Sequence, residues 1–345
     1  MKKIKYPKPL QPSSYIGVTA PSSGVESSLH ILIEKAKLQV EKMGVQVIIG
    51  ETARTQHKGR SASKEKRADE LMKFLLDDQI NAIIPPWGGS FAMEILPILD
   101  WAKLKEMDPK WLLGYSDIST LNFAYTTITG NASAHGVNFS ELSAPEWDEL
   151  SGKWMEVLSC RENEEVTQYS SEKYQSSWEQ VFANPAKGFF LDSQTAWKTL
   201  NHEDEVTFSG RLIGGCVNTL QVLVGTPFDQ VTHFVHEYCE EEGVIWYLET
   251  VGMDAAKIYR ALWQMQQNNW FSNIKGVLFG RTSSYEDLGD FTLTDALRDV
   301  FESYNIPVIY DADIGHTPPQ NILVNGALAT VKYNSGKGSI TMKFI

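Results

Sequence analysis

The feature that most constrains the fold is the alternation of strand-like and helix-like segments over the first 130 residues. Short apolar runs predict buried strands at 15–20, 45–50, 80–86 and 111–115, and apolar stripes at helical spacing predict helices over 26–43, 61–79, 91–106 and 117–129. Strands that alternate with helices form a parallel, doubly wound α/β sheet. Because such sheets bind ligands beyond the carboxyl ends of their strands, we expect a functional site at that edge.

The second half of the chain repeats the alternation and then changes it. Strands are predicted at 211–215, 244–249, 274–280 and 306–315, with helices between them. The tail alternates apolar and polar residues, and Asn325-Gly326 and Asn334-Ser335-Gly336 are typical of hairpin turns. The sequence therefore predicts a second, mixed α/β domain that ends in an antiparallel tail.

A polar segment separates the two halves. Residues 161–209 show no amphipathic period, so we expect a linker or a long surface loop, of the kind that often contributes to function. A chain of 345 residues is long enough for two domains. We therefore predict an N-terminal domain over 1–160, a linker or substrate loop over 161–209 and a C-terminal domain over 210–345.

Charge and cysteine content narrow the class of protein. The 31 basic and 43 acidic side chains give a net charge of −12, which argues against nucleic acid or an anionic membrane as a partner. No apolar run approaches the ~20 residues that span a bilayer. The three cysteines, Cys160, Cys216 and Cys239, lie far apart with no C-x-x-C pair, as in a reducing compartment. We expect a soluble, cytoplasmic protein.

The sharpest local motif is WLLGYSDISTL at 111–121. A buried strand ends at Gly114-Tyr115, Ser116 follows, and a helix starts at Asp117. A serine at such a turn projects its hydroxyl above the sheet, beside the positive end of the helix. The backbone N–H of Asp117 could then stabilise an oxyanion. The alternative is that Ser116 only caps the helix.

The turn PPWGGS at 85–90 lies at the end of the neighbouring predicted strand. Gly88 and Gly89 let the backbone approach a ligand closely and present N–H groups to it, so this turn is a second candidate for the oxyanion hole. An ordinary strand-to-helix turn is the alternative. Trp87 and Ser90 belong to the same turn and are candidate substrate contacts.

A nucleophilic serine needs a base, and the base needs a carboxylate to orient it. His316 follows a strand and precedes Pro318-Pro319, which suits a base held in place. Glu249 ends the apolar strand VIWYL and is the candidate carboxylate, with Asp311 and Asp313 as rivals and a solvated strand-end Glu as the simpler interpretation. The chain order serine, acid, histidine is that of α/β-hydrolases.

Other polar residues lie near the predicted sheet edges. His135, in SAHGVNF, and Arg281, after the strand at 274–280, are candidate substrate contacts. His233 and His236 have a spacing that could mimic a metal site, but no third ligand is placed convincingly. We therefore expect neither a metal nor a cofactor.

Several motifs together resemble one known family. IGVTAPSS, IIPPWGGSFAMEILPILDW, LLGYSDISTLNFA, SAHG, GRLIGGCVNTL, LET and DADIGHTPPQ occur in the order typical of the LD-carboxypeptidase and microcin C immunity protein (MccF) family of serine peptidases. The resemblance implies a metal-free, two-domain enzyme that is often a homodimer. It also implies Ser116 as nucleophile, Glu249 as acid and His316 as base, with an oxyanion hole formed by the N–H groups of Gly88 or Gly89 and of Asp117.

The resemblance leaves two activities open. LD-carboxypeptidases remove the terminal D-alanine of the murein tetrapeptide during cytoplasmic recycling, whereas the immunity peptidases cut the amide between an aminoacyl or peptidyl group and a nucleotide analogue. The ILPILDW continuation and the long insert with Trp178 favour the immunity-like activity, and murein tetrapeptide cleavage is the alternative. A non-catalytic ligand-binding module is an alternative of another class.

Trp178 is the isolated large aromatic residue of the polar insert. It has no apolar run around it, so we expect it to pack against a nucleobase or another aromatic group of the substrate. The alternative is that Trp178 anchors the insert to its own domain.

Overall fold

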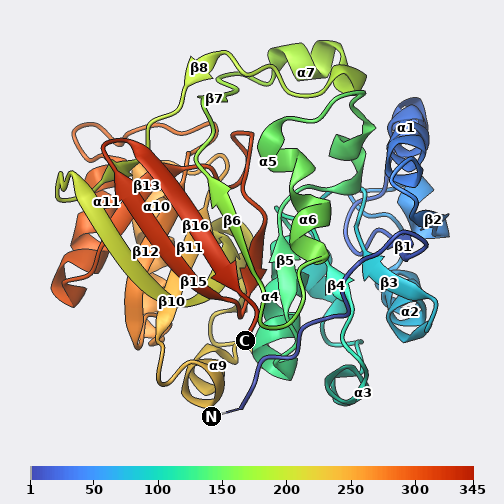
Figure 1. Ribbon diagram of the computed structural model, residues 1–345, viewed down its shortest axis with the longest axis horizontal. Coiled ribbons are helices and arrows are strands. Elements are labelled where there is room, and N and C mark those ends of the chain that lie inside the picture. The colour runs from blue at the N-terminus through green and yellow to red at the C-terminus, as the bar shows by residue number, and fades with distance from the viewer. Residues whose placement is uncertain (1) are drawn as a thin grey trace.

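The computed structural model describes residues 2–345 (Figure 1). Its N-terminal half is built on a four-stranded parallel sheet in the order β2-β1-β3-β4. The strands are β1 (Tyr15–Val18), β2 (Gln46–Ile49), β3 (Ile80–Ile83) and β4 (Trp111–Leu112). This arrangement confirms the predicted doubly wound sheet. Because the strand order reverses at β1, the loops after β1 and β3 lie side by side at the carboxyl edge.

The helices of this half are α1 (His30–Glu41), α2 (Lys64–Leu76), α3 (Trp101–Glu106) and α4 (Ile118–Thr129), followed by the short α5 (Glu149–Gly152) and α6 (Trp154–Leu158). The predicted helix over 91–106 is wrong in its extent. A 3-10 turn at Ala92–Ile95 is separated from α3 at Pro97, which cannot donate the hydrogen bond that a continuous helix needs.

Helix α4 is buried on nearly every side because it lies between the two halves of the molecule. Its Phe123 stacks on Trp270 with ring centroids 5.1 Å apart, and Trp270 stacks on Trp246 at 5.7 Å. The helix ends at Gly130, whose φ of +74° is the left-handed conformation that glycine adopts without strain. This packing fixes the first turn of α4, where the candidate serine lies.

The C-terminal half is built on an eight-stranded sheet in the order β6-β16-β15-β10-β11-β12-β13-β9. Its strands are β6 (Glu165–Tyr169), β9 (Lys198–Thr199), β10 (Glu205–Cys216), β11 (Val244–Glu249), β12 (Ile274–Gly280), β13 (Val308–Ala312), β15 (Leu328–Asn334) and β16 (Lys337–Lys343). Strands β10 to β13 are parallel and the flanking strands are antiparallel, as the mixed α/β prediction requires. The helices of this half are α8 (Val217–Leu220), α9 (Val231–Tyr238), α10 (Ala255–Gln267) and α11 (Leu293–Phe301).

One of the two predicted hairpin turns is confirmed. Ser335 and Gly336 both have positive φ, +45° and +90°, and they join the paired strands β15 and β16. The other is wrong, because β14 (Leu323–Asn325) pairs with β5 (Ser133–His135) of the N-terminal half. The Asn325 side chain is fully buried, and its amide N–H donates to the hydroxyl of Ser133 on β5 at 3.1 Å. Its amide oxygen accepts from the backbone N–H of Gly214 and the hydroxyl of Tyr247, so this side chain connects the two halves.

The segment 161–209 differs from the expected linker. Its ends are strands of the large sheet, with β6 at one edge and β9 at the other. Edge strands that are short or have one solvated face need few apolar residues, which explains the polar sequence. The middle of the segment carries β7 (Lys173–Tyr174), α7 (Glu179–Ala183) and β8 (Ser193–Gln194), and it crosses from one half of the molecule to the other at the top of Figure 1.

None of the described helices is both long enough and apolar enough to cross a membrane.

Candidate active site

Ser116 occupies a strained turn between β4 and α4. Its φ of +62° is rare for a residue with a side chain and raises the hydroxyl above the carboxyl edge of the sheet. The N-cap of α4 is Asp117, so the interpretation of Ser116 as a helix cap is wrong. The Ser116 Oγ instead lies 3.0 Å from Nε2 of His316.

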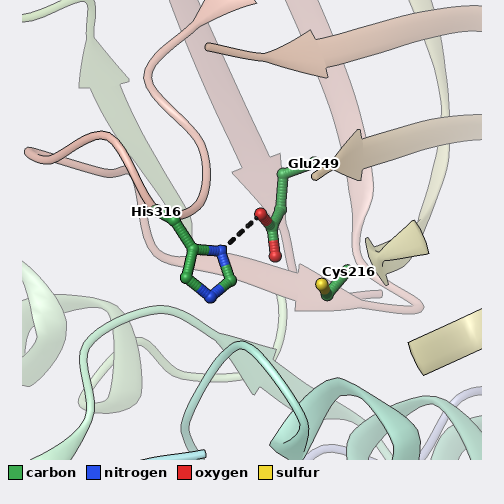
Figure 2. Close-up of side chains that lie close together, drawn as sticks. All are labelled: Cys216, Glu249 and His316. Carbon is green, nitrogen blue, oxygen red and sulfur yellow. Dashed lines mark hydrogen bonds and ion pairs between the residues drawn. The ribbon is translucent and has the colours of Figure 1, made fainter. Parts of the chain in front are cut away.

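His316 is held from its other ring nitrogen by Glu249. The Nδ1 atom lies 2.7 Å from the Oε2 atom of Glu249, as Figure 2 shows. Glu249 is the last residue of β11 and is fully buried, whereas the side chain of His316 is 14% exposed. The rival carboxylates are engaged elsewhere, because Asp311 pairs with Lys198 at 2.8 Å and Asp313 pairs with Arg281 at 2.6 Å.

Burial and pairing act in opposite directions on these two groups. Burial alone would raise the pKa of Glu249, but the adjacent His316 outweighs it and holds that pKa below its usual value. Burial alone would lower the pKa of His316, but Glu249 outweighs it and raises that pKa above its usual value. The pair is therefore arranged to stabilise a proton that arrives on His316.

The glycine turn after β3 lies against both Ser116 and the first backbone N–H of the α4 N-terminus. A Cβ built on Gly88 would stand 2.8 Å from the Ser116 Oγ and 2.9 Å from the backbone N of Asp117, so these three groups converge. Within residues 2–345, the N–H groups of Gly88, Gly89 and Asp117 have no hydrogen-bond acceptor. Unpaired donors of this kind, at the N-terminus of α4 and in the adjacent loop after β3, suit a developing oxyanion.

The Asp117 carboxylate ties these loops together. Its Oδ2 accepts hydrogen bonds from the Ser22 hydroxyl at 2.5 Å and from the Ala92 N–H at 2.8 Å. The Ser22 Oγ in turn accepts the N–H of Phe91 at 3.1 Å. The loops after β1 and β3 are thereby fixed to the turn that carries Ser116.

Two cavities open beside Ser116 and His316. One, of about 300 Å³, has largely apolar walls that include Leu29, Leu32, Pro86, Trp87, Trp178 and Phe189. The other, of about 800 Å³, is rich in hydroxyls, among them Ser176, Ser177, Thr282, Ser283 and Thr317. Tyr115, Trp178 and His316 line both cavities, so these three residues stand where the cavities adjoin.

Trp178 lies where the polar insert crosses the site. Its indole N–H donates to the backbone carbonyl of His316 at 3.0 Å, and its ring meets Phe189 edge-on at 6.1 Å. Trp87 donates its indole N–H to the carbonyl of Gly24 at 3.1 Å and faces the apolar cavity. Both tryptophans thus present ring surface to the space beside Ser116.

Three candidate contacts lie outside both cavities. Ser90 is exposed and lines neither cavity. His135 is buried behind Tyr115 and Tyr247, with its Nδ1 3.4 Å from the Ser119 hydroxyl, and burial lowers its pKa to about 4. These two expectations are corrected, because a strand end by itself does not decide which way a side chain points.

Arg281 is likewise a structural residue. Its guanidinium is buried against Asp313 and donates to the carbonyls of Thr317 and Pro319 at 3.3 and 3.2 Å. Arg281 therefore stabilises the loop that carries His316. Because Asp313 neutralises its charge, Arg281 is not available to bind an anionic ligand.

Sequence reasoning missed a pair of residues in the apolar cavity. The hydroxyl of Tyr115 donates to Oε1 of Glu141 at 2.6 Å, and both side chains line that cavity. Glu141 also accepts the N–H of Asn138 at 3.1 Å within a capping box. The spacing Asn138 to Glu141 is a recognisable capping signal, but it does not indicate a site.

One group of potential metal ligands coincides with this site. Cys216, Glu249 and His316 bring one ligand atom each within 4.8 Å of one another (Figure 2). The donor set suits a metal poorly. Burial raises the pKa of the Cys216 thiol well above its usual value, which keeps it protonated, and both ring nitrogens of His316 already have partners. His233 and His236 lie apart from this group, on α9.

The fold and the serine site agree with one family of enzymes. The chain belongs to the LD-carboxypeptidase family of serine peptidases: the model of the family's N-terminal domain matches residues 16–136, and the model of its C-terminal domain matches residues 209–331. It is accordingly a serine carboxypeptidase by family.

Curated relatives extend over nearly the whole chain. YocD of Bacillus subtilis, which carries the name of a carboxypeptidase, is 27% identical over 97% of this chain and 98% of its own. A second Bacillus subtilis protein, named for murein peptide carboxypeptidase activity, is 23% identical over 94% and 91%. The microcin C7 self-immunity protein MccF of Escherichia coli is 23% identical over 89% and 87%.

Solved structures share the fold. An MccF-like protein from Bacillus anthracis superposes with a TM-score of 0.84 at 23% identity, covering 99% of both chains. MccF in complex with glutamyl sulfamoyl guanosine superposes with a TM-score of 0.81 at 21% identity, covering 98% of this chain and 99% of that one.

Proposed function

We propose that Ser116, His316 and Glu249 are the catalytic triad of this carboxypeptidase. The observation that carries the proposal is the continuous chain of contacts from the Ser116 Oγ through both ring nitrogens of His316 to the Glu249 carboxylate, at 3.0 and 2.7 Å. The strained turn at Ser116 and the unpaired N–H groups around it support the same assignment.

The proposed reaction follows from this geometry. His316 Nε2 accepts the Ser116 proton while Oγ attacks the amide carbonyl carbon, and Glu249 stabilises the resulting imidazolium. The N–H of Asp117 and that of Gly88 or Gly89 hold the oxyanion. As the C–N bond breaks, His316 returns the proton to the leaving amine. A water molecule, deprotonated by His316, then hydrolyses the acyl-enzyme and frees Ser116.

We infer that the substrate is an amide between an aminoacyl or peptidyl group and a nucleotide-like leaving group. Trp178 supports this inference, because it stands where the cavities adjoin, and Trp87 and Phe189 give the apolar cavity further aromatic surface. Stacking on one aromatic side chain is worth roughly 1–3 kcal/mol per base. The ligand glutamyl sulfamoyl guanosine in the MccF complex is of this chemical type.

Cleavage of the murein tetrapeptide is the second candidate function. The hydroxyl-rich cavity of about 800 Å³ is large enough for an extended peptide, and one relative is named for that activity. A side-by-side assay of murein tetrapeptide and an aminoacyl sulfamoyl adenosine decides between the two. We expect faster turnover of the nucleotide, and turnover of the tetrapeptide alone would contradict our choice of substrate.

The experiment on the triad is fluorophosphonate labelling of the intact protein and of Ser116→Ala. We expect one labelled site in the wild type, loss of labelling and turnover in the variant, and a melting temperature within a few degrees of the wild type. Absence of labelling in a well-folded wild-type protein would favour the non-catalytic binding module. EDTA should leave turnover unchanged, since the assigned chemistry uses side chains and backbone N–H groups alone.

The experiment on Trp178 separates stacking from anchoring. Trp178→Ala should raise KM for the aminoacyl nucleotide about tenfold or more, while Trp178→Phe, which keeps an aromatic face but loses the N–H to the His316 carbonyl, should raise it less. Trp263→Ala, at a half-exposed tryptophan on α10, is the control. An equal loss on both substrates with a lower melting temperature would support the anchoring role.

Three other expectations stay predictions. The homodimer can be checked by light scattering on the purified protein, the cytoplasmic location by fractionation, and the domain boundaries by limited proteolysis around residues 161–209.

A further inference from the structure

The apolar cavity beside Ser116 contains one carboxylate, that of Glu141. This residue lies in the 3-10 turn Phe139–Ser143, which follows β5, and the capping box at Asn138 fixes its orientation. One carboxylate oxygen accepts from the Tyr115 hydroxyl and the other from the Asn138 N–H. Since each oxygen has two lone pairs, Glu141 retains acceptor capacity toward the cavity.

In the part of the chain that the structure describes, no lysine or arginine balances this carboxylate, and the one nearby group that can become cationic is His316, whose charge lowers the pKa of Glu141 less than burial raises it. Among the described residues that line the two cavities there is no lysine or arginine, and the acidic side chains are Glu141 and Glu179. Arg281, behind the larger cavity, is neutralised by Asp313. While His316 is neutral, as it must be to accept the Ser116 proton, an anion placed in the apolar cavity would lose its hydration without gaining a cationic partner. A cation placed there would gain an anionic partner, the Glu141 carboxylate.

The charge of Glu141 is itself incompletely compensated. Burial raises the pKa of Glu141 to about 7, and the hydrogen bond from Tyr115 offsets only part of that effect. A cation or a strong N–H donor at the remaining lone pairs would stabilise the ionised carboxylate, and the carboxylate would stabilise the bound group in return.

We propose that the apolar cavity is a subsite for a substrate group with an apolar or aromatic body that ends in an ammonium or another N–H donor, received by Glu141, and that it rejects carboxylates. Two parts of a substrate could supply this chemistry: an amine on the acyl residue, or the amino edge of a nucleobase. The inference rests on the proposed function only in taking Ser116 as the reacting group.

The first test needs no substrate. Phenethylamine and 3-phenylpropionate share an aromatic body and differ in the charge of the end group, and each is tested for slowing of fluorophosphonate labelling at Ser116. We expect phenethylamine to protect at a concentration about tenfold lower than 3-phenylpropionate. Glu141→Gln should remove this preference, while Glu179→Gln, which removes the same charge from the other cavity, should keep it. Equal protection by both compounds, or better protection by the acid, in the wild type would overturn the proposal even if Glu141→Gln failed to fold.

The second test identifies the source of the donor. Lysyl and glutamyl sulfamoyl adenosine vary the acyl residue, and the adenosine and purine riboside forms of one conjugate, which differ only in the exocyclic amino group, vary the base edge. We expect one of the two kcat/KM ratios to favour the donor-bearing member in the wild type and to collapse in Glu141→Gln. If the conjugates are turned over and neither ratio responds to Glu141, the subsite is wrong. If no conjugate is turned over, the proposed substrate is wrong, and the protection assay still decides the subsite.

Discussion

The α-carbon of Gly88 lies directly against the side chain of Ser116. A Cβ built on Gly88 would stand 2.7 Å from the Ser116 Cβ and 2.8 Å from its Oγ, closer than carbon atoms pack. Glycine is required here by contact distance, because any side chain at residue 88 would displace either the nucleophile or the loop that presents the N–H groups. The turn PPWGGS and the turn GYSD therefore form one unit across the ends of β3 and β4.

Gly88→Ala should impair catalysis far more than folding. The added methyl group must push Ser116 out of line with His316, and a displacement of about 1 Å can cost on the order of 10²-fold in rate. We expect kcat/KM to fall about 100-fold or more, measured by steady-state kinetics. Gly152→Ala is the control, because a Cβ there meets no atom within 4 Å, and its activity should equal that of the wild type. An active Gly88→Ala enzyme would argue against the convergence of these two turns.

The strain at Ser116 should be visible in stability. At a φ of +62°, alanine bears the same conformational cost as serine, whereas glycine does not. Ser116→Gly should therefore be more stable than Ser116→Ala by about 1 kcal/mol, although both variants lack turnover. Thermal or urea unfolding of the two variants measures the difference. An alanine variant as stable as the glycine variant would mean that the turn carries no strain.

The sequence predicts where the strands and helices lie better than it predicts which strands pair with one another. Parallel strands buried on both faces are continuous apolar runs, which is why β1, β3 and β11 could be located from sequence. The pairing of β14 with β5 could not, since an apolar strand before Asn325-Gly326 looks the same whether its partner is local or 190 residues away. Helix α9 is not among the predicted helices, because its eight residues give only about two turns of periodic pattern. Its buried residues are Val231, Phe234, Val235 and Tyr238.

The same limit applies to the site. Glu249 is the last residue of one apolar strand and Arg281 directly follows another, so position relative to the strand does not distinguish a catalytic from a structural role. Their surroundings differ: Glu249 faces His316, whereas Arg281 meets Asp313, which lies 32 residues further along the chain. Burial of His135 and the pairing of Tyr115 with Glu141 depend likewise on contacts between segments that no single motif contains.

Glu249→Gln should change the pH dependence of catalysis as well as its rate. His316 must be neutral to act as a base, and because Glu249 raises its pKa, wild-type kcat/KM should rise with pH and reach half its maximum above about pH 6.5. Without the carboxylate that pKa falls, so the midpoint should move to lower pH while the plateau drops about 10³-fold or more. A pH profile with an unchanged midpoint would make Glu249 a bystander.

Arg281→Met tests the structural role assigned to Arg281. The substitution leaves the buried Asp313 without its cation, and breaking a buried pair in this way typically costs about 3–5 kcal/mol. We expect a lower melting temperature and a lower kcat, because the loop that carries His316 loses its brace. A raised KM with unchanged stability would instead restore Arg281 as a substrate contact.

Glu141 should make the stability of the folded protein depend on pH. Its pKa is raised to about 7 in the folded protein, whereas an unfolded chain releases the same proton near pH 4.3. Between these values the folded protein holds a proton that the unfolded chain has lost, so the free energy of unfolding falls as the pH rises through this window.

Glutamine at residue 141 cannot ionise, so the Glu141→Gln variant does not lose stability in this way. The melting temperature of Glu141→Gln, relative to the wild type, should therefore increase between pH 5 and pH 8. Glu179→Gln, at an exposed position, should show a constant difference from the wild type over the same range. A constant difference for Glu141→Gln as well would mean that the carboxylate is already compensated, and it would remove the electrostatic reason for a cation in the apolar cavity.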